Sequence, residues 1–227
     1  MPNDDHLSND LKHVEIGTGF LPAWKWTGAD VPELLYEINE SCLAALQKGA
    51  QGYVKDPASH PFNIVKLHQH LWLDLNELAL RRAARVPCLL VDVHFQSEEW
   101  WRWARSHRAK SSKSERALAA FAPKVARNLM VETLVLAWHT ARSDRPTATL
   151  LLGIAPVVAD RIAELSSRDV RRIAAEHCRE LKPRFEGNGI FWQRLLLAAR
   201  SGDAQTLVQV YREGIQLLAT EVLPGVR

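Results

Sequence analysis

The sequence of 227 residues contains no apolar stretch long enough to cross a membrane. The longest uncharged run near the middle of the chain, residues 146–159, is too short and contains two prolines. The acidic and polar start, MPNDDHLSND, is unlike a secretory signal or a transit peptide. We therefore expect a soluble cytoplasmic protein, in which the 47% of apolar residues form a sizeable core.

Cysteine is also scarce, and an odd number without an export signal argues against a disulfide framework. The three cysteines are Cys42, Cys88 and Cys178. Cys88 and Cys178 could pair, or could bind a metal with His68, His70 or His177. The sequence has no CxxC motif, and a spacing of two residues points His68 and His70 to different sides of a helix. We predict buried, reduced thiols and no metal site.

The motifs of common enzymes are missing as well. There is no Walker A sequence, and no GxGxxG, GxSxG or HExxH motif. Asp92, His94, Glu98 and Glu99 form an acid and base cluster in the sequence, but the expected alternation and helical spacing would scatter them. The sequence therefore predicts no catalytic residues and no cofactor.

Charge is distributed unevenly along the chain. Residues 1–40 carry eight acidic side chains against two basic ones, whereas residues 102–127 carry eight basic side chains against one acidic one. A basic segment of this kind attracts phosphate or an acidic partner. The alternative is a solvated linker, which is favoured by the serine-rich stretch SHRAKSSKSER at residues 106–116. Both interpretations remain open from the sequence.

Helical periodicity dominates the rest of the chain and predicts a mainly α fold. We expect helices over residues 31–49, 64–73, 75–85, 98–108, 117–142, 156–164, 166–178 and 190–200, and a last one from Asp203. Gly49 should end the first helix, and Pro123 should bend the one that contains it. Asp169 lies at capping-box distance from Ser166. Residues 88–95 read as an extended segment. The buried face of the last helix should hold Leu207, Val208, Tyr211, Ile215, Leu218 and Val222.

The two halves of the chain resemble one another at an offset of ninety residues. Identical residues at this offset are Ile64 and Ile154, Leu75 and Leu165, Arg81 and Arg171, Arg82 and Arg172, Ala84 and Ala174, Cys88 and Cys178, and Phe95 and Phe185. We interpret them as a tandem duplication, with modules at 1–105 and 117–227 and the linker 106–116 between them. Each module would bury its apolar face against the other, so we expect an intramolecular pseudo-dimer with approximate two-fold symmetry.

Three of the eight tryptophans lie within four positions, at Trp100, Trp101 and Trp103. The offset aligns the first two with Ile190 and Phe191, which indicates a recurring buried anchor. Trp103 has no aromatic counterpart and lies between Arg102 and Arg105. It is the candidate for a partner-binding or other surface role.

The second half resembles the FlhD family of flagellar regulators over Val135–Ala174, VLAWHTARSDRPTATLLLGIAPVVADRIAELSSRDVRRIA. The matching features are the Asp144-Arg145 pair, Leu152-Gly153-Ile154, and Pro183-Arg184-Phe185 after a shift of one residue. Further apolar positions of the family match at Ala159, Ile162, Leu165, Val170 and Ile173. The resemblance implies a mostly helical module that dimerises and assembles with a zinc-bearing, FlhC-like subunit to bind promoter DNA.

The resemblance and the charge pattern together predict a subunit of a transcriptional regulator. Candidate DNA-contacting residues are Arg102, Arg105, Arg108, Lys110, Lys113, Arg168, Arg171, Arg172 and Arg184. Arginine can pair with guanine or phosphate, although solvated helix faces are the commoner role. The expected partners are an FlhC-like subunit and DNA, reached directly or through that subunit, and further homo-oligomerisation is left open. The alternative is a protein-binding adaptor or antiactivator that never touches DNA.

Overall fold

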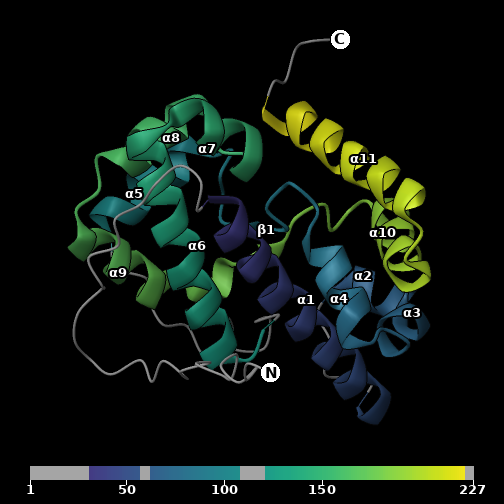
Figure 1. Cartoon of the computed structure of the whole chain (residues 1–227). Helices are drawn as coiled ribbons and strands as arrows, with labels where there is room; N and C mark the ends of the chain where they lie inside the picture. Colours follow the sequence, from purple (N-terminus) through teal and green to yellow (C-terminus); the bar gives the residue numbers. More distant parts are fainter. Residues whose placement is uncertain (1–30, 57–61, 108–120, 223–227) are drawn as a thin grey trace, which may run out of the picture.

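The computed structural model describes residues 31–56, 62–107 and 121–222, and these are mainly helical (Figure 1). The first half contains α1 (Val31–Lys55), α2 (Asn63–Leu67), α3 (Gln69–Leu73), α4 (Glu77–Ala84), β1 (Val91–Asp92) and α5 (Glu98–Ser106). The second half contains α6 (Pro123–Ser143), α7 (Arg145–Leu152), α8 (Pro156–Ala163), α9 (Ser167–His177), a 3-10 turn (Cys178–Glu180), β2 (Lys182–Pro183), α10 (Gly189–Ser201) and α11 (Ala204–Val222). No helix among these is long and apolar enough to span a membrane.

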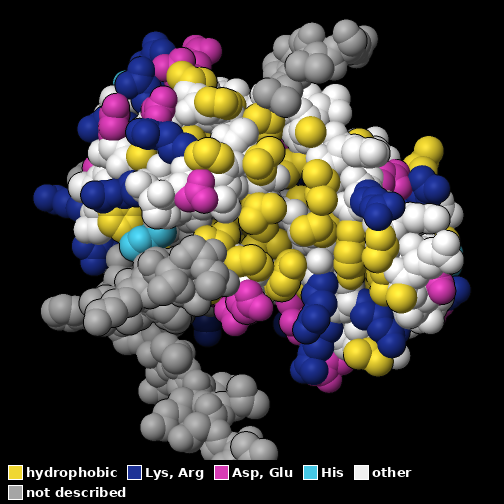
Figure 2. All heavy atoms as spheres, turned by 45° about the horizontal axis from the view of Figure 1, so that its top comes forward, with side chains coloured by type: hydrophobic (Ala, Val, Ile, Leu, Met, Phe, Trp, Pro, Cys, Tyr) yellow, Lys and Arg dark blue, Asp and Glu magenta, His cyan; other side chains and the backbone are white. Residues whose placement is uncertain are grey.

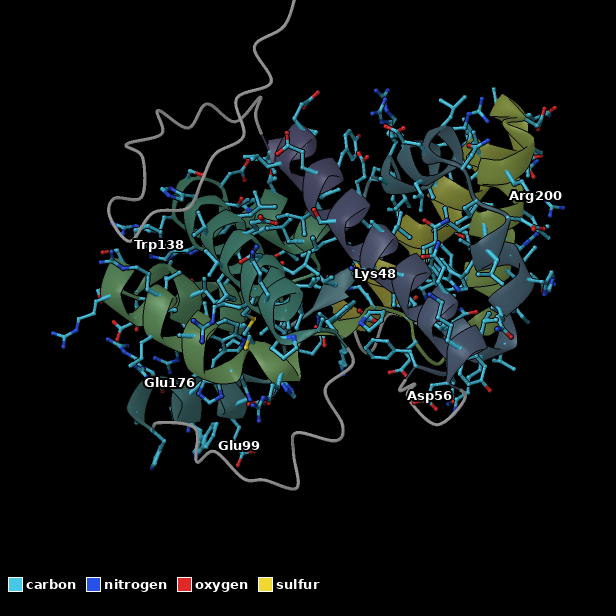
Figure 3. The ribbon with its side chains drawn as sticks, turned by 90° about the horizontal axis from the view of Figure 1, so that it is seen from below. Lys48, Asp56, Glu99, Trp138, Glu176 and Arg200 are labelled. Carbon is cyan, nitrogen blue, oxygen red and sulfur yellow. The ribbon has the colours of Figure 1, made fainter. Side chains whose placement is uncertain are left out.

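The long helices α1 and α6 pack against one another at the centre of the molecule, and the shorter helices form a group on either side (Figures 1 and 3). Each half contributes one helix that packs on helices of the other half. Helix α5 of the first half packs on α8 and α9, and α10 of the second half packs on α2, α3 and α4. The core is therefore continuous between the halves, and buried residues from both belong to one cluster.

The two short strands join the halves as an antiparallel pair, with Val91 opposite Pro183 and Asp92 opposite Lys182. The residues Cys88 to Val91, around the start of β1, are all apolar. They are completely buried between the two groups of helices. The regular extended segment expected over residues 88–95 is thus limited to two residues. Outside the strand pair, backbone hydrogen bonds from Leu89 N to Leu151 O (3.0 Å) and from Arg184 N to Leu90 O (2.8 Å) satisfy two further polar groups of this segment.

The same turn follows each strand. His94 and Phe185 have positive φ angles of 49° and 55°, which bulky residues rarely adopt. In each turn the carbonyl of this residue accepts a hydrogen bond from the amide of the next helix's N-cap residue, Ser97 (2.9 Å) or Asn188 (2.8 Å). These turns correspond at an offset of 91 residues rather than 90, and so do the strands before them, because the second half has one more residue ahead of its strand.

The shift of one residue corrects the alignment of the aromatic anchors. Trp100 and Trp101 correspond to Phe191 and Trp192, not to Ile190 and Phe191. Trp101 and Trp192 are both fully buried, and their indole Nε1 atoms donate to the carbonyls of His94 (3.1 Å) and Phe185 (3.2 Å). Ile190, which the ungapped alignment placed in the core, is 68% exposed.

Several helix boundaries differ from the predicted ones. Helix α1 runs through Gly49 and Gly52 to Lys55, because glycine weakens a helix by only about 1 kcal/mol and the buried Ala50 anchors this turn. Pro123 begins α6 rather than bending it, since proline is well tolerated in the first turn. Helix α7 was not expected as a separate element. Asp144 caps its start, and Gly153, at φ 62°, ends it.

The last helix is capped by Asp203 as predicted, since its carboxylate accepts from Thr206 N (2.7 Å). Its buried face is turned from the predicted one. Val208 and Ile215 are 46% and 41% exposed, while Val210 and Gly214 are buried. Gly214 faces Cys88 and Val86, at a distance that leaves no room for a side chain without movement of these neighbours. Close approach of α11 to this buried segment sets the rotation of the helix.

Candidate functional site

Three exposed arginines lie on α9 and the 3-10 turn that follows it: Arg168, Arg171 and Arg179. Arg168 and Arg171 are three residues apart and share a side of α9, and Arg179 lies beyond its C-terminal end. Within the described residues, none of them forms an ion pair or a hydrogen bond. The predicted capping box starts this helix, because Ser166 Oγ accepts from Asp169 N (3.2 Å) and Asp169 Oδ2 from Ser166 N (3.1 Å). Sequence reasoning missed Arg179, although its distance from Arg168 is three helical turns.

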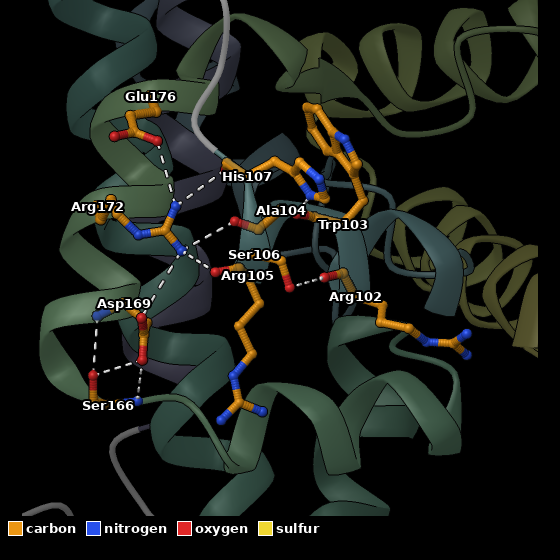
Figure 4. A network of polar contacts seen from close by, with 10 residues as sticks. All are labelled: Arg102, Trp103, Ala104, Arg105, Ser106, His107, Ser166, Asp169, Arg172 and Glu176. Carbon is orange, nitrogen blue, oxygen red and sulfur yellow. Dashed lines mark hydrogen bonds and ion pairs between the residues drawn. The ribbon is translucent and has the colours of Figure 1, made fainter.

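Arg172 serves a different purpose from its neighbour Arg171. Its guanidinium donates to the carbonyls of Ala104 (3.0 Å), Arg105 (2.8 Å) and His107 (3.3 Å), at the C-terminal end of α5 (Figure 4). A helix leaves its last carbonyls without partners and carries a partial negative charge there, so a cation at this end is stabilising. Glu176, at 3.4 Å, and Asp169 hold the guanidinium from the side of α9. Arg172 thus fixes the end of α5 against α9.

Arg82 plays the corresponding part on the other side of the molecule. It lies ninety residues before Arg172, and it donates to Ala199 O (3.3 Å) at the C-terminal end of α10. It also packs against Gly202, the C-cap of that helix. Tyr211 Oη donates to the Arg82 carbonyl. The repeated Arg-Arg pairs therefore supply one helix-capping arginine in each half, with its guanidinium bonded to the end of a neighbouring helix.

Arg102 and Arg105 are exposed but paired. Arg102 contacts Glu98 (3.0 Å) and Arg105 contacts Glu164 (3.2 Å). Arg161 also contacts Glu98 (3.0 Å). Hydrogen bonds from Arg161 and then Arg102 lower the pKa of the Glu98 carboxyl. These pairs offset part of the positive charge that the sequence places on α5.

Arg184 is buried, which rules out the predicted DNA contact in this structure. The residue is 2% exposed, and its guanidinium lies between Asp92 (3.6 Å) and Glu221 (3.4 Å). It also lies 5.6 Å above the ring of Phe95, a cation–π distance. Its charge is directed to the junction of the two strands and not to solvent.

The remaining candidates are partly outside the described residues. Arg108, Lys110 and Lys113 belong to the segment 108–120, which lies outside them. Trp103 is 41% exposed; its ring stacks on His107 (5.8 Å) and meets the edge of His177 (5.2 Å). It is thus available at the surface, next to the place where the basic segment begins.

A polar cluster lies beneath Trp103, where α5 meets the end of α9. The Glu180 carboxylate accepts from His177 Nδ1 (2.8 Å) and Trp100 Nε1 (2.6 Å), and lies 3.1 Å from His94 Nε2. Burial by itself raises the pKa of Glu180, but the bonds from His177, His94 and Trp100 outweigh it and lower the pKa from 4.5 to about 2. The cluster ties the two halves together on this side.

Acid should weaken this connection. Because the pKa of Glu180 is lower in the folded than in the unfolded chain, its stabilisation is complete above the ordinary pKa and is lost as the pH falls towards the folded value. We expect the free energy of unfolding to fall more steeply from about pH 5 to about pH 3 in the wild type than in Glu180→Gln. Urea titrations followed by circular dichroism measure this slope. Glu99→Gln, on exposed α5 surface, should keep the wild-type slope; equal slopes for all three proteins would contradict the expectation.

The thiols and the metal-binding side chains show no arrangement for chemistry. Cys42 and Cys88 are fully buried, and burial raises the pKa of each thiol to about 12. Cys178 is partly exposed, so the prediction of a buried thiol is wrong for this residue; all three cysteines are free. Among residues 31–56, 62–107 and 121–222, no three histidine, cysteine or acidic side chains come together to hold a metal ion. The exposed arginines therefore remain as the strongest candidate for a functional surface.

The described fold is mainly helical, and exposed arginines without ion pairs lie on α9 and the turn that follows it. The family model of the flagellar transcriptional activator FlhD matches residues 126–212, from α6 into α11. This confirms the resemblance for a single FlhD domain in the second half, and the match gives no second copy in the first. The description is that of a regulator, in agreement with the prediction that the chain is not an enzyme. Neither a curated protein nor a solved structure matches the chain.

Proposed function

We propose that the chain is a cytoplasmic subunit of an FlhD-like transcriptional activator, which assembles with an FlhC-like partner and contributes phosphate contacts to promoter DNA. Its mechanism is scaffolding: the helices hold a basic surface in place, and the partner supplies the remaining DNA contacts. The observation that carries the DNA contact is the row formed by Arg168, Arg171 and Arg179. Unpaired guanidinium groups can neutralise backbone phosphates without first breaking an ion pair within the protein.

The basic segment adds to this surface. His107, the last described residue before this segment, is held beside α9 by Arg172, and we propose that the basic residues that follow it in sequence contribute to DNA binding. They include Arg108, Lys110 and Lys113. Trp103 stands at the same place and offers a stacking surface. Together these residues would bind DNA largely without regard to sequence, leaving base readout to the partner.

We also propose that the chain is a tandem pair of FlhD-like modules fused into a pseudo-dimer. What supports this is a set of correspondences between the halves: the central helices α1 and α6, the capping arginines Arg82 and Arg172, and the tryptophans Trp101 and Trp192. The strands correspond at an offset of 91 residues, and an axis of approximate two-fold symmetry would exchange the two facing pairs, Val91 with Pro183 and Lys182 with Asp92. Because the dimer interface would be internal, we expect a monomeric chain in solution.

The DNA-binding proposal predicts a defined loss on removal of the arginine row. The variant Arg168→Ala/Arg171→Ala/Arg179→Ala should bind a DNA duplex about tenfold to a hundredfold more weakly at low salt. Its plot of log affinity against log salt concentration should be shallower by about 2 to 3, because each lost phosphate contact removes about 0.9 from the slope. Fluorescence anisotropy with a labelled promoter fragment measures both quantities, for the chain alone and with a co-expressed FlhC-like partner.

A matched control is Arg81→Ala. Arg81 corresponds to Arg171 in the first half, but it is paired with Glu77 and Glu40 and should matter little. Equal DNA affinity and equal salt slope for the triple variant and the wild type would overturn the assignment of the surface.

The second candidate function is a protein-binding adaptor that never contacts DNA. The observation in its favour is the pairing of Arg102 with Glu98 and of Arg105 with Glu164, which reduces the positive charge on α5. Absence of salt-dependent DNA binding, with and without the partner, would favour the adaptor over the DNA-contacting subunit.

A further inference from the structure

Helices α10 and α11 form a hairpin around Gly202 and enclose an open groove of about 990 Å³. Arginines from both helices line it: Arg194, Arg200 and Arg212. Arg194 pairs with Glu213 (2.9 Å) inside the groove, and Arg200 pairs with Asp74 (3.1 Å) at its rim. Arg212 is exposed and forms no ion pair with the described residues. The groove thus has more positive than negative charge, and one guanidinium is free to receive an anionic side chain.

The groove also has apolar lining from both helices. Leu197 of α10 is 39% exposed within it, and Val210 of α11 lies buried at its base. Ile190 lies two helical turns before Leu197 and is 68% exposed. Figure 2 shows an apolar band in the middle of one face of the molecule, with Lys and Arg on either side. Exposed apolar side chains at helical spacing, flanked by cations, are typical of a surface that receives another helix.

We propose that this groove is the docking site for an acidic amphipathic helix of a partner protein. The inference deepens the proposed function, since it names the surface and chemistry by which a partner would be held. Leucine-type side chains of the partner would cover Leu197 and Ile190, while its carboxylates would meet Arg212 and the paired arginines. A DNA backbone fits less well, because it would leave Leu197 and Ile190 without an apolar contact.

The groove has no counterpart in the first half of the described structure. Helix α5 corresponds to α10, but among the described residues no helix lies beside it as α11 lies beside α10. The described residues therefore offer one such site, and we infer that one helix docks on it. The site also lies away from α9: Arg200 and Glu176 are at opposite sides of the molecule (Figure 3). Docking and DNA contact are thus separable by mutation.

The probe is a synthetic, fluorescently labelled helical peptide of about 18 residues, with leucines on one face and glutamates along both edges. Anisotropy titrations with the full chain should give a dissociation constant on the order of 10 μM. The variant Leu197→Glu/Arg212→Glu should weaken binding at least tenfold, as expected for a reversed charge and a lost apolar anchor. Arg212→Glu alone, at an exposed position without a described partner, keeps the test available if the double variant misfolds. Arg142→Glu, on the exposed end of α6, should bind the peptide as the wild type does.

Three results would overturn the proposal. The first is that the acidic peptide does not bind, or that a control peptide binds as tightly as it does. The control peptides have either the same composition in scrambled order or lysines in place of the glutamates. The second is a loss of duplex DNA affinity in Leu197→Glu/Arg212→Glu, which would give the groove to DNA. The third is a dimeric wild type that this variant turns into a monomer, which would give it to a second copy. The triple variant on α9 should bind the peptide normally, so failure of DNA binding leaves this result intact.

Discussion

Replacement of Trp101 by alanine should lower the free energy of unfolding by about 3–5 kcal/mol. The side chain is 2% exposed, and its ring stacks on Phe95 at 6.2 Å and meets the edge of Trp100 at 5.0 Å. Its indole nitrogen also satisfies the carbonyl of His94, which sits in a strained turn. The substitution removes these contacts and leaves a cavity between the halves. Denaturant unfolding followed by circular dichroism measures the difference.

Trp103 provides the control on the same helix. Because 41% of its side chain is exposed, Trp103→Ala should cost less than about half as much as Trp101→Ala. Equal losses for the two variants would mean that Trp103 is a core residue, and would remove it from the candidate surface. A loss of DNA or partner binding in Trp103→Ala, with stability nearly unchanged, would support its surface role.

The second large effect is expected at Asn39, a completely buried residue of α1. Its side-chain amide donates to the carbonyls of Ala84 (3.1 Å) and Cys88 (2.9 Å), and its oxygen accepts from Leu90 N (2.8 Å). The segment from α4 to β1 has irregular backbone, so these groups have no ladder to bond with. Asn39→Leu would leave them unsatisfied at about 1–3 kcal/mol each, and we expect a total loss of about 3 kcal/mol or more.

Asn76 is the natural comparison for this experiment. Its side chain caps α4 by accepting from Ala79 N (2.8 Å), at a position where water can replace it. Asn76→Ala should therefore cost only about 1 kcal/mol. If thermal and denaturant unfolding gave Asn39→Leu a similarly small loss, the buried segment would have to find other partners, contrary to the structure.

Local signals in the sequence predicted local structure well. The capping box at Ser166, the cap at Asp203 and the proline at the start of α8 each depend on neighbouring residues, and all appear at the expected helix ends. Predictions failed where packing decides the outcome. Gly49 did not end α1, and the face of α11 was set by its approach to Cys88 rather than by apolar periodicity. An alignment without gaps could not detect the additional residue in the second half, and so it misaligned the aromatic residues that follow the turns.

The site illustrates the same limit. Arg171 and Arg172 are adjacent and chemically identical, and the sequence assigned both to DNA. Only the position of α5 decides that Arg172 caps a helix end while Arg171 faces solvent. Arg184 was misassigned for the same reason, since its burial depends on Asp92 and Glu221 from distant parts of the chain. Conversely, the groove between α10 and α11 had no sequence signal, because its lining comes from two helices whose facing sides are set by the hairpin.

The exchange of helices between the halves has a consequence for the order in which the protein can fold during synthesis. Helix α4 presents an apolar side that α10 covers, but α10 is translated more than a hundred residues later. The first half leaves the ribosome with that side uncovered and with β1 lacking its only described pairing partner. Contacts of such long sequence separation form slowly, and an early chain with exposed apolar surface is prone to aggregate. The nascent chain thus depends on completion of α10 before its first half can reach its native stability.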